Sequence, residues 1–354
     1  MPENTLPPSE AEKIIYNCHN HTFNHENIPN KYFPIGLVPA ARIKPLRWVL
    51  RMAMKGIIPW TKNDKVHRYA NFIKAAYRKT QEANLERLMS YYPSGTHFIV
   101  LPMDMAYMGA GKVKEDIEAQ HAELARLKAD PKYRDILIPF AHIDPRRPGA
   151  LGRLKNLVEN DGFKGVKIYP TLGYGPDNPI LMDQIYPYMI EKNIPLMAHC
   201  SPGSVNSHDI TRKEAHAFAD PDNYQGVMDV HPELKVCLGH FGGIGEWRRH
   251  LNSSNNTDNQ TWLSKIRKMI LSGNYPNLYT DISYTIFNFQ ENVSFLKVLL
   301  EDDRLRSRVL FGSDFYMVES EKYPERRLSI DLRSDLGGPW FWEIANTNPK
   351  RYIG

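Results

Sequence analysis

Short apolar segments and longer amphipathic segments alternate along most of this chain. In the segment 291–302, for example, apolar residues recur at Val293, Leu296 and Leu299, which is the spacing of one helix face. Apolar strands that alternate with helices are typical of parallel βα units, and eight such units suit a closed (β/α)8 TIM barrel of the α/β class. The eight predicted strands are 13–18, 97–105, 136–145, 163–170, 194–200, 235–243, 278–284 and 309–315.

An open, doubly wound sheet is the alternative architecture for the same pattern. Its dinucleotide-binding form has little support, because no glycine-rich GxGxxG sequence follows the first predicted strand. The length of 354 residues, 42% of them hydrophobic, is ample for one large core. We therefore expect residues 1–354 to form a single barrel domain.

A basic segment interrupts the alternation between the first two strands. Residues 31–90 contain 13 Lys and Arg against 3 Asp and Glu. We predict a helical insertion at about 31–68, which serves as a lid or a subunit contact, followed by the first barrel helix at 69–92. No nucleic-acid-binding motif accompanies the positive charge, so we expect no nucleic-acid partner. A helix that lies on a membrane surface is a less favoured reading.

The cysteines and the terminal sequence indicate a compartment. Cys18, Cys200 and Cys237 all lie in apolar segments, which predicts buried, reduced thiols. The first residues lack the basic and apolar regions of a signal peptide, and no apolar run is long enough to span a bilayer. We expect a cytoplasmic protein without integral membrane association.

Polar residues stand where most of the apolar strands end. In a TIM barrel the carboxyl ends of the strands meet at one face, so these side chains should share one cavity. Each one alone has a plain structural reading, such as a buried core histidine or a helix N-cap. Together, imidazole nitrogens and a carboxylate suit Zn²⁺ with one position open to water. The strand-end residues are His19, His21, Lys167, Tyr169, His199, His240 and Asp314.

Four further polar residues also lie near strand ends. Asp104, His142, Asp144 and Asp281 could line the same cavity. For these we expect structural roles, namely hydrogen bonds to loop backbones and helix caps.

Several of these strand ends form an ordered set of motifs. "NCHNH", "GFKGVKIYP", "PLMAHC", "LGHFGG", "FGSDF" and the closing "NTNPKRYIG" together resemble the amidohydrolase superfamily, and more narrowly its amidohydrolase-2 branch. That branch also contains aminocarboxymuconate-semialdehyde decarboxylase and γ-resorcylate decarboxylase. The resemblance covers nearly the whole chain outside 31–92. One departure is that Asn17 and Cys18 stand where many relatives carry an acidic residue.

The resemblance implies roles for the matching residues. His19, His21, His199 and Asp314 would bind one divalent metal ion, most simply Zn²⁺, and His240 would lie beside the substrate. In two-metal members a carboxylated lysine on the fourth strand bridges the ions. A second metal on Lys167 therefore stays open, although one metal is favoured. Lys167, Tyr169 and Tyr284 are the candidate substrate-binding residues.

The leading functional hypothesis is a metal-dependent hydrolase that acts on an amide, ester or lactone bond of a small, anionic substrate. Asp314 would accept a proton from water, and His240 would polarise the substrate carbonyl. The alternative is a metal-dependent, non-oxidative decarboxylase of an aromatic or unsaturated acid. A non-catalytic barrel would lack an expected ligand, and none is missing. The apolar face of residues 46–58 and the habit of the family suggest a homodimer.

Overall fold

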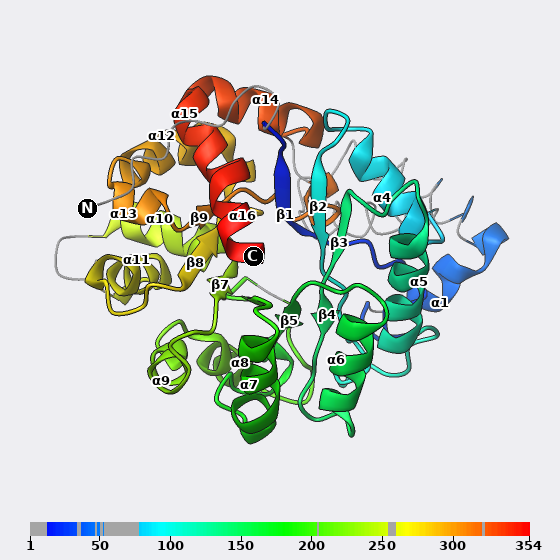
Figure 1. Cartoon of the computed structure of the whole chain (residues 1–354). Helices are drawn as coiled ribbons and strands as arrows, with labels where there is room; N and C mark the ends of the chain where they lie inside the picture. Colours follow the sequence, from blue (N-terminus) through cyan, green and yellow to red (C-terminus); the bar gives the residue numbers. More distant parts are fainter. Residues whose placement is uncertain are drawn as a thin grey trace.

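The computed structural model describes most of the chain outside the N-terminus and the basic insertion (Figure 1). The described residues are 13–33, 37–46, 48–49, 52, 78–203, 205–253, 260–320 and 323–354.

All the strand pairs in the described residues are parallel, and the strands follow one another in sequence order. One sheet has the order β1-β2-β3 and the other has the order β4-β5-β6-β7-β8-β9. The strands are β1 (Tyr16–Asn20), β2 (His97–Val100), β3 (Leu137–Pro139), β4 (Ala141–His142), β5 (Val166–Ile168), β6 (Leu196–Ala198), β7 (Val236–Leu238), β8 (Leu278–Asp281) and β9 (Val309–Leu310).

Backbone hydrogen bonds join the two sheets into one closed barrel. β3 and β4 are a single barrel strand: Phe140 N–H between them donates to Val100 O (3.0 Å), and Ala141 N–H donates to Gly165 O (2.8 Å). At the other seam, Cys18 N–H donates to Phe311 O at 2.9 Å. The predicted eight-stranded TIM barrel is therefore confirmed, and its first and last strands are neighbours.

Helices surround the barrel (Figure 1). Their starts follow capping chemistry where a polar side chain precedes them: the side chains of Asp116 and Thr261 accept from the first turns of α5 and α11. The main helices are α5 (Ile117–Ala129), α6 (Ala150–Glu159), α7 (Tyr186–Glu191), α8 (Arg212–Ala219), α9 (Asn223–Val230), α10 (Ile244–Asn252), α11 (Trp262–Ser272), α12 (Phe289–Leu300), α13 (Asp303–Arg306), α14 (Glu325–Leu336), α15 (Gly338–Trp342) and α16 (Asn348–Ile353).

The first barrel helix is shorter than the sequence pattern predicts. Of the predicted helix at 69–92, residues 69–77 lie outside the described residues, and only α4 (Gln81–Met89) is α-helical in the remainder. Thr80 stops the helix from extending backwards, because its extended backbone places the hydroxyl as a cap on Ala83 N–H (3.1 Å). The helical insertion begins with α1 (Leu37–Arg42), but most of 31–68 lies outside the described residues.

Apolar side chains fill the barrel, and α16 closes its amino-terminal end. Cys18, Ile99, Met197 and Cys237 are all buried in this inner cluster. Tyr352 of α16 packs against the same cluster, and its hydroxyl donates to Leu196 O at 2.8 Å. The opposite, carboxyl end is thus the end that is free to hold a polar site.

The fold also bears on the state of the thiols and on membrane-spanning helices. Cys18, Cys200 and Cys237 are buried and unbridged, as predicted. Among the described residues, every helix is too short or too polar to cross a membrane.

Candidate metal and substrate site

His19 and His21 are fixed in orientation by hydrogen bonds on one side of each ring. His19 Nδ1 lies 2.8 Å from Asp281 Oδ2, and His21 Nδ1 lies 2.7 Å from the carbonyl oxygen of Leu101. Both acceptors require a proton on Nδ1, so both Nε2 atoms carry a lone pair. Two imidazole lone pairs from β1 therefore face the barrel mouth, as the HxH spacing predicts.

Asp314 lies opposite this pair. Its Oδ1 is 3.2 Å from His21 Nε2 and 3.9 Å from His19 Nε2. This buried oxygen has no hydrogen-bond partner within the described part of the chain. Burial acts to raise the pKa of Asp314, but the contact with His21 and the neighbouring histidines lower it overall, which keeps the carboxylate ionised.

His199 and His240 form a second pair, with His240 Nε2 3.2 Å from His199 Nδ1. His199 Nε2 donates to Ser201 O at 3.1 Å. The Ser283 hydroxyl donates to Asp281 and so accepts from His240 Nδ1 at 2.9 Å. When the rings are neutral, both facing nitrogens carry lone pairs, which repel each other. A shared proton or a bound cation between the two nitrogens would remove that repulsion.

Glycines and unusual backbone conformations allow this close approach. A side chain on Gly312 would lie 2.9 Å from the Cβ of His19, and one on Gly239 would lie 3.1 Å from its Cε1. The residues that these glycines bring to the mouth, His240 and Asp314, both have a φ of 67°. Such left-handed conformations cost energy for residues other than glycine and tend to occur at functional sites. Close packing against His19 therefore explains why the "LGH" and "FGSD" motifs contain glycine.

Lys167 and Tyr169 line the same mouth from β5. Lys167 is 1% exposed, and its Nζ lies 3.5 Å from His19 Nε2. Burial lowers the pKa of Lys167 to about 8, so the amine is still mostly cationic at neutral pH. The ring of Tyr169 stacks on that of His199, with centroids 4.2 Å apart. A buried cation and an aromatic face thus border the histidines.

Tyr284, the third candidate substrate-binding residue, is less closely tied to the site. Its backbone N–H donates to Ser313 O (3.3 Å), next to Asp314, and its side chain is half-buried against the core. Its role stays a prediction.

Asp281 does more than the loop-bonding role that the sequence suggested for it. It accepts from the backbone N–H of His240 (3.1 Å) and of Ser283 (2.9 Å), as expected, but it also orients the His19 ring. This function was not predicted, although the carboxyl end of the "LYTD" strand was a signal for it.

Of the other three polar strand-end side chains, two have hydrogen-bond partners and one has none within the part of the chain that the structure describes. Asp104 accepts from the backbone N–H of Ala106 (3.1 Å) and Asp144 from that of Arg146 (2.9 Å), which are the expected hydrogen bonds to loop backbones. Both carboxylates also form ion pairs that were not predicted, with Arg147 and Arg146 respectively. His142 is 3% exposed, and neither of its ring nitrogens has a partner among the described residues.

Comparison with known proteins places this chain in a family. The amidohydrolase family model Amidohydro_2 matches residues 18–352. The chain belongs to the amidohydrolase family. This confirms the resemblance that the strand-end motifs suggest. A search of curated proteins gives no match for this amidohydrolase.

Solved structures of similar fold include two decarboxylases and a hydratase. A 2,6-dihydroxybenzoate decarboxylase from Rhizobium is 19% identical, with a TM-score of 0.52 over 80% of this amidohydrolase and 91% of that chain. A dihydroxybenzoic acid decarboxylase from Polaromonas sp. JS666, solved with bound manganese and 2-nitroresorcinol, is 16% identical, with a TM-score of 0.56 over 96% of both chains. A 4-oxalomesaconate hydratase from Rhodopseudomonas palustris is 17% identical, with a TM-score of 0.53 over 96% and 95%.

The side chains of this amidohydrolase suit the divalent metal ion that its family implies. His19, His21 and Asp314 offer donor atoms within 4.8 Å of one another, and His19, His240 and Asp281 form a second such group. Burial and Lys167 lower the pKa of His19 to about 3, and burial also lowers the pKa of His199 and of His240. Neutral imidazoles beside an ionised carboxylate are the donors that a metal ion such as Zn²⁺ prefers.

Replacing Asp281 with asparagine tests whether it orients His19. We expect Asp281→Asn to fold but to bind metal about 10- to 100-fold more weakly, because the ring loses the carboxylate that sets its tautomer. Metal content after dialysis against a graded chelator measures this. Asp104→Asn, which removes another buried strand-end carboxylate, is the control. Equal metal retention by Asp281→Asn and the unmodified protein would contradict the assignment.

Proposed function

We propose that this amidohydrolase is a metal-dependent, non-oxidative decarboxylase of a small aromatic or unsaturated carboxylic acid. The observation that carries the proposal is the buried ammonium of Lys167, 3.5 Å from His19 Nε2 at the site of converging lone pairs. A buried cation there favours an anionic substrate group. Two fold neighbours act on hydroxylated benzoates, which supports this choice over the hydrolase that the motifs alone favoured.

Several residues would bind and orient the substrate. His19, His21, His199 and Asp314 would hold the divalent ion, which when bound polarises the substrate oxygens. Lys167 would pair with the substrate carboxylate or an adjacent oxygen, and Tyr169 would present its ring beside the substrate. These contacts would hold the carboxylate in a dry cavity, where its loss as neutral carbon dioxide is favoured.

His240 would carry the proton. Its Nδ1–H is held at Ser283, so Nε2 is the ring nitrogen that would take up a second proton and pass it to the substrate. Burial lowers the pKa of His240 and eases proton release, whereas the Asp314 carboxylate favours the protonated form. The proton would join the carbon that bears the carboxylate. The carbon–carbon bond would then break, its electron pair would restore the double bond, and carbon dioxide would leave.

The test is to incubate the metal-loaded enzyme with dihydroxybenzoates and unsaturated acids in D₂O. We expect release of carbon dioxide and one deuterium on the product carbon that carried the carboxylate, detected by mass spectrometry. His240→Asn should show neither. Unchanged acids together with cleavage of esters, lactones or amides would reject the decarboxylase and restore the hydrolase.

Hydrolysis is the second candidate, and one observation favours it. Asp314 Oδ1 has no partner beyond the histidines among the described residues, so it is free to accept a proton from an attacking water. The same carboxylate would have no such task in the decarboxylation.

We propose one bound ion, with zinc as the choice that the nitrogen-rich donor set favours.

Lys167→Gln distinguishes a substrate-binding lysine from a carboxylated lysine that bridges two ions. If Lys167 pairs with substrate, KM should rise at least about tenfold while the metal count stays unchanged, since a charge-assisted contact is lost. Elemental analysis and steady-state kinetics measure both. Loss of one of two ions would instead support a carboxylated, bridging Lys167.

We also propose that the basic insertion contributes to a homodimer. Trp48 and Val49 are 60% and 53% exposed, and their neighbours Ile43, Leu46 and Met52 are exposed as well. Large apolar side chains exposed within one short segment favour a protein contact. Light scattering on Trp48→Glu should give a monomer where the unmodified chain gives a dimer. The lid role at 31–68 stays an untested proposal.

A further inference from the structure

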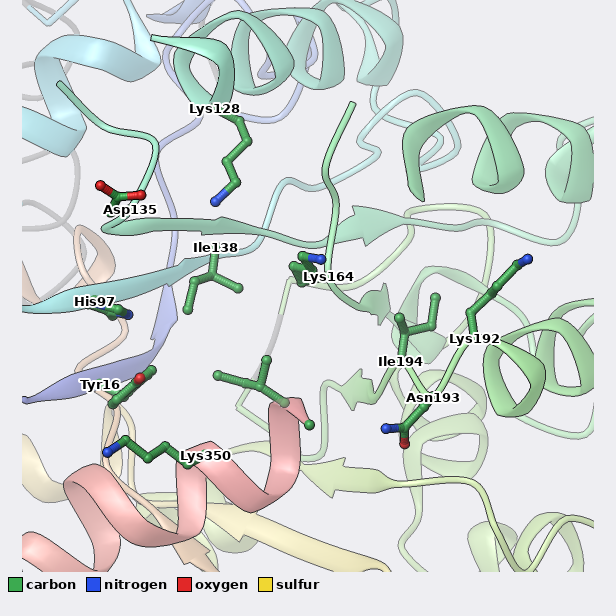
Figure 2. A pocket seen from close by; sticks show the side chains of 12 residues that line it. Tyr16, His97, Lys128, Asp135, Ile138, Lys164, Lys192, Asn193, Ile194 and Lys350 are labelled. Atoms are coloured by element: carbon green, nitrogen blue, oxygen red, sulfur yellow. The ribbon is translucent and has the colours of Figure 1, made fainter. Parts of the chain in front are cut away.

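A cavity of about 440 Å³ lies at the amino-terminal end of the barrel, away from the candidate metal site (Figure 2). Tyr16 and His97 stand at the starts of β1 and β2, and Lys350 comes from α16. The packed barrel interior, with residues such as Ile99 and Met197, separates this end from the carboxyl-end histidines. The cavity is therefore not an extension of the candidate metal site.

Four lysines dominate the charge of the lining, against one acidic side chain, Asp135. Lys192 is neutralised in part, since its Nζ lies 3.1 Å from Glu191 and 3.7 Å from Glu159. For Lys164 and Lys350, the described residues supply no carboxylate within ion-pair distance. Two lysine charges at this cavity thus lack a counter-ion from the described chain.

Lys128 is held so that its charge stays at the cavity. Its Nζ donates to the carbonyl oxygens of Arg134 (2.5 Å) and Leu137 (2.8 Å), which leaves a third N–H for another acceptor. Burial and then the charge of Lys164 lower the pKa of Lys128, so the two ammonium groups repel each other. Figure 2 shows the Lys128 side chain extending from α5 towards this lining. An anion bound between these lysines would offset that repulsion.

The lining also indicates which anion fits. No arginine is among the described lining residues, and arginine is the side chain that matches a planar carboxylate with two parallel bonds. Lysine ammonium groups are compact point charges, which suit a tetrahedral phosphate approached from several sides. Ile138 and Ile194 add an apolar wall, and the volume exceeds that of one phosphate ion.

We propose that this cavity binds a small phosphorylated molecule, with Lys128, Lys164 and Lys350 as the phosphate-binding side chains. The site is independent of the proposed decarboxylation.

The experiment is isothermal titration of the full-length, metal-loaded protein with pyrophosphate and with ADP as probes. We expect saturable binding that weakens with added salt. Lys164→Gln and Lys350→Gln should each weaken it about tenfold, because each removes a charge-assisted contact. Lys268→Gln, which removes an exposed lysine from α11, is the matched control and should bind as the unmodified protein does.

Thermal unfolding separates binding from a purely structural role of the lysines. Without probe, Lys164→Gln should melt at the same or a slightly higher temperature, since a like charge near Lys128 is removed. With pyrophosphate, the melting temperature should rise for the unmodified protein and Lys268→Gln but not for Lys164→Gln. Equal affinities in all variants, no binding of either probe, or competition between pyrophosphate and a ligand of the metal site would overturn the proposal.

Discussion

Replacing His199 with alanine is expected to remove bound metal and turnover together while the protein stays folded. His199 Nδ1 carries a lone pair that faces His240 at the carboxyl end of the barrel, and a metal ion there would not be part of the packed core. Metal analysis, activity and circular dichroism on the same preparation measure the three outcomes. A variant with full metal occupancy would show that His199 is not a ligand.

His240→Asn is expected to behave differently. It should keep most of the metal but lose turnover by a factor on the order of 10² to 10⁴, the usual contribution of a positioned acid or base. His240 lies between the rings of His19 and His199, with centroid distances of 4.6 and 4.9 Å, so it is close enough to act on a substrate held beside those ligands. If His240→Asn lost the metal and His199→Ala retained it, His240 would be the metal ligand and His199 the residue needed for turnover.

A suitable control for both variants is His231→Ala. His231 Nε2 donates to Met182 O at 2.9 Å, but this histidine is the C-cap residue of α9, on the outside of the barrel. Its loss should leave metal content and turnover near those of the unmodified protein. A large effect of His231→Ala would indicate general sensitivity of the fold to histidine removal.

Glu325→Gln is expected to stabilise the protein above neutral pH. Glu325 is 7% exposed, its Oε1 accepts from the Tyr92 hydroxyl at 2.6 Å, and burial raises its pKa from 4.5 to about 7. A raised carboxyl pKa means that the folded state holds a proton that the unfolded state has released. Stability is therefore lost as the pH rises from about 4.5 to about 7, by up to about 3 kcal/mol for this shift.

The glutamine variant cannot ionise, so this loss should disappear. Urea unfolding at pH 5 and pH 8 should show a smaller decrease for Glu325→Gln than for the unmodified protein, with the larger gain at pH 8. Glu233→Gln, at an exposed position, is the control and should leave the pH dependence unchanged. An identical pH dependence for Glu325→Gln and Glu233→Gln would contradict a raised pKa.

Much of the fold was predictable because each barrel strand is an apolar run in the sequence, whatever the length and structure of the loops between the strands. All eight predicted runs overlap a strand, although β1 extends past the first run to Asn20, and the third run contains two short strands that break at Phe140. The helix at 69–92 was placed too broadly because periodicity alone does not reveal a cap, and Thr80 acts through its backbone conformation. The insertion at 31–68 falls largely on residues that the structure does not describe.

The candidate site was predictable to the extent that its residues end strands. His19, His21 and Asp314 converge, and His199 meets His240, as that rule requires. The orienting contacts were not predictable, because they join residues distant in sequence. Neither the Asp281–His19 pair nor the carbonyl of Leu101 at His21 leaves a local pattern. The choice between hydrolase and decarboxylase depends on substrate contacts, which the ligand motif does not encode.

The seam between β1 and the chain after β9 has a consequence for how the protein matures. Asn17 donates to Ser313 at 2.9 Å across 296 residues of sequence, and Asp314 N–H donates to His19 O at 2.8 Å. No partly synthesised chain that lacks the eighth strand can assemble the full donor set. Ion capture should therefore be a late event in folding, and the fraction of metallated molecules in a fresh preparation should report how many barrels have closed.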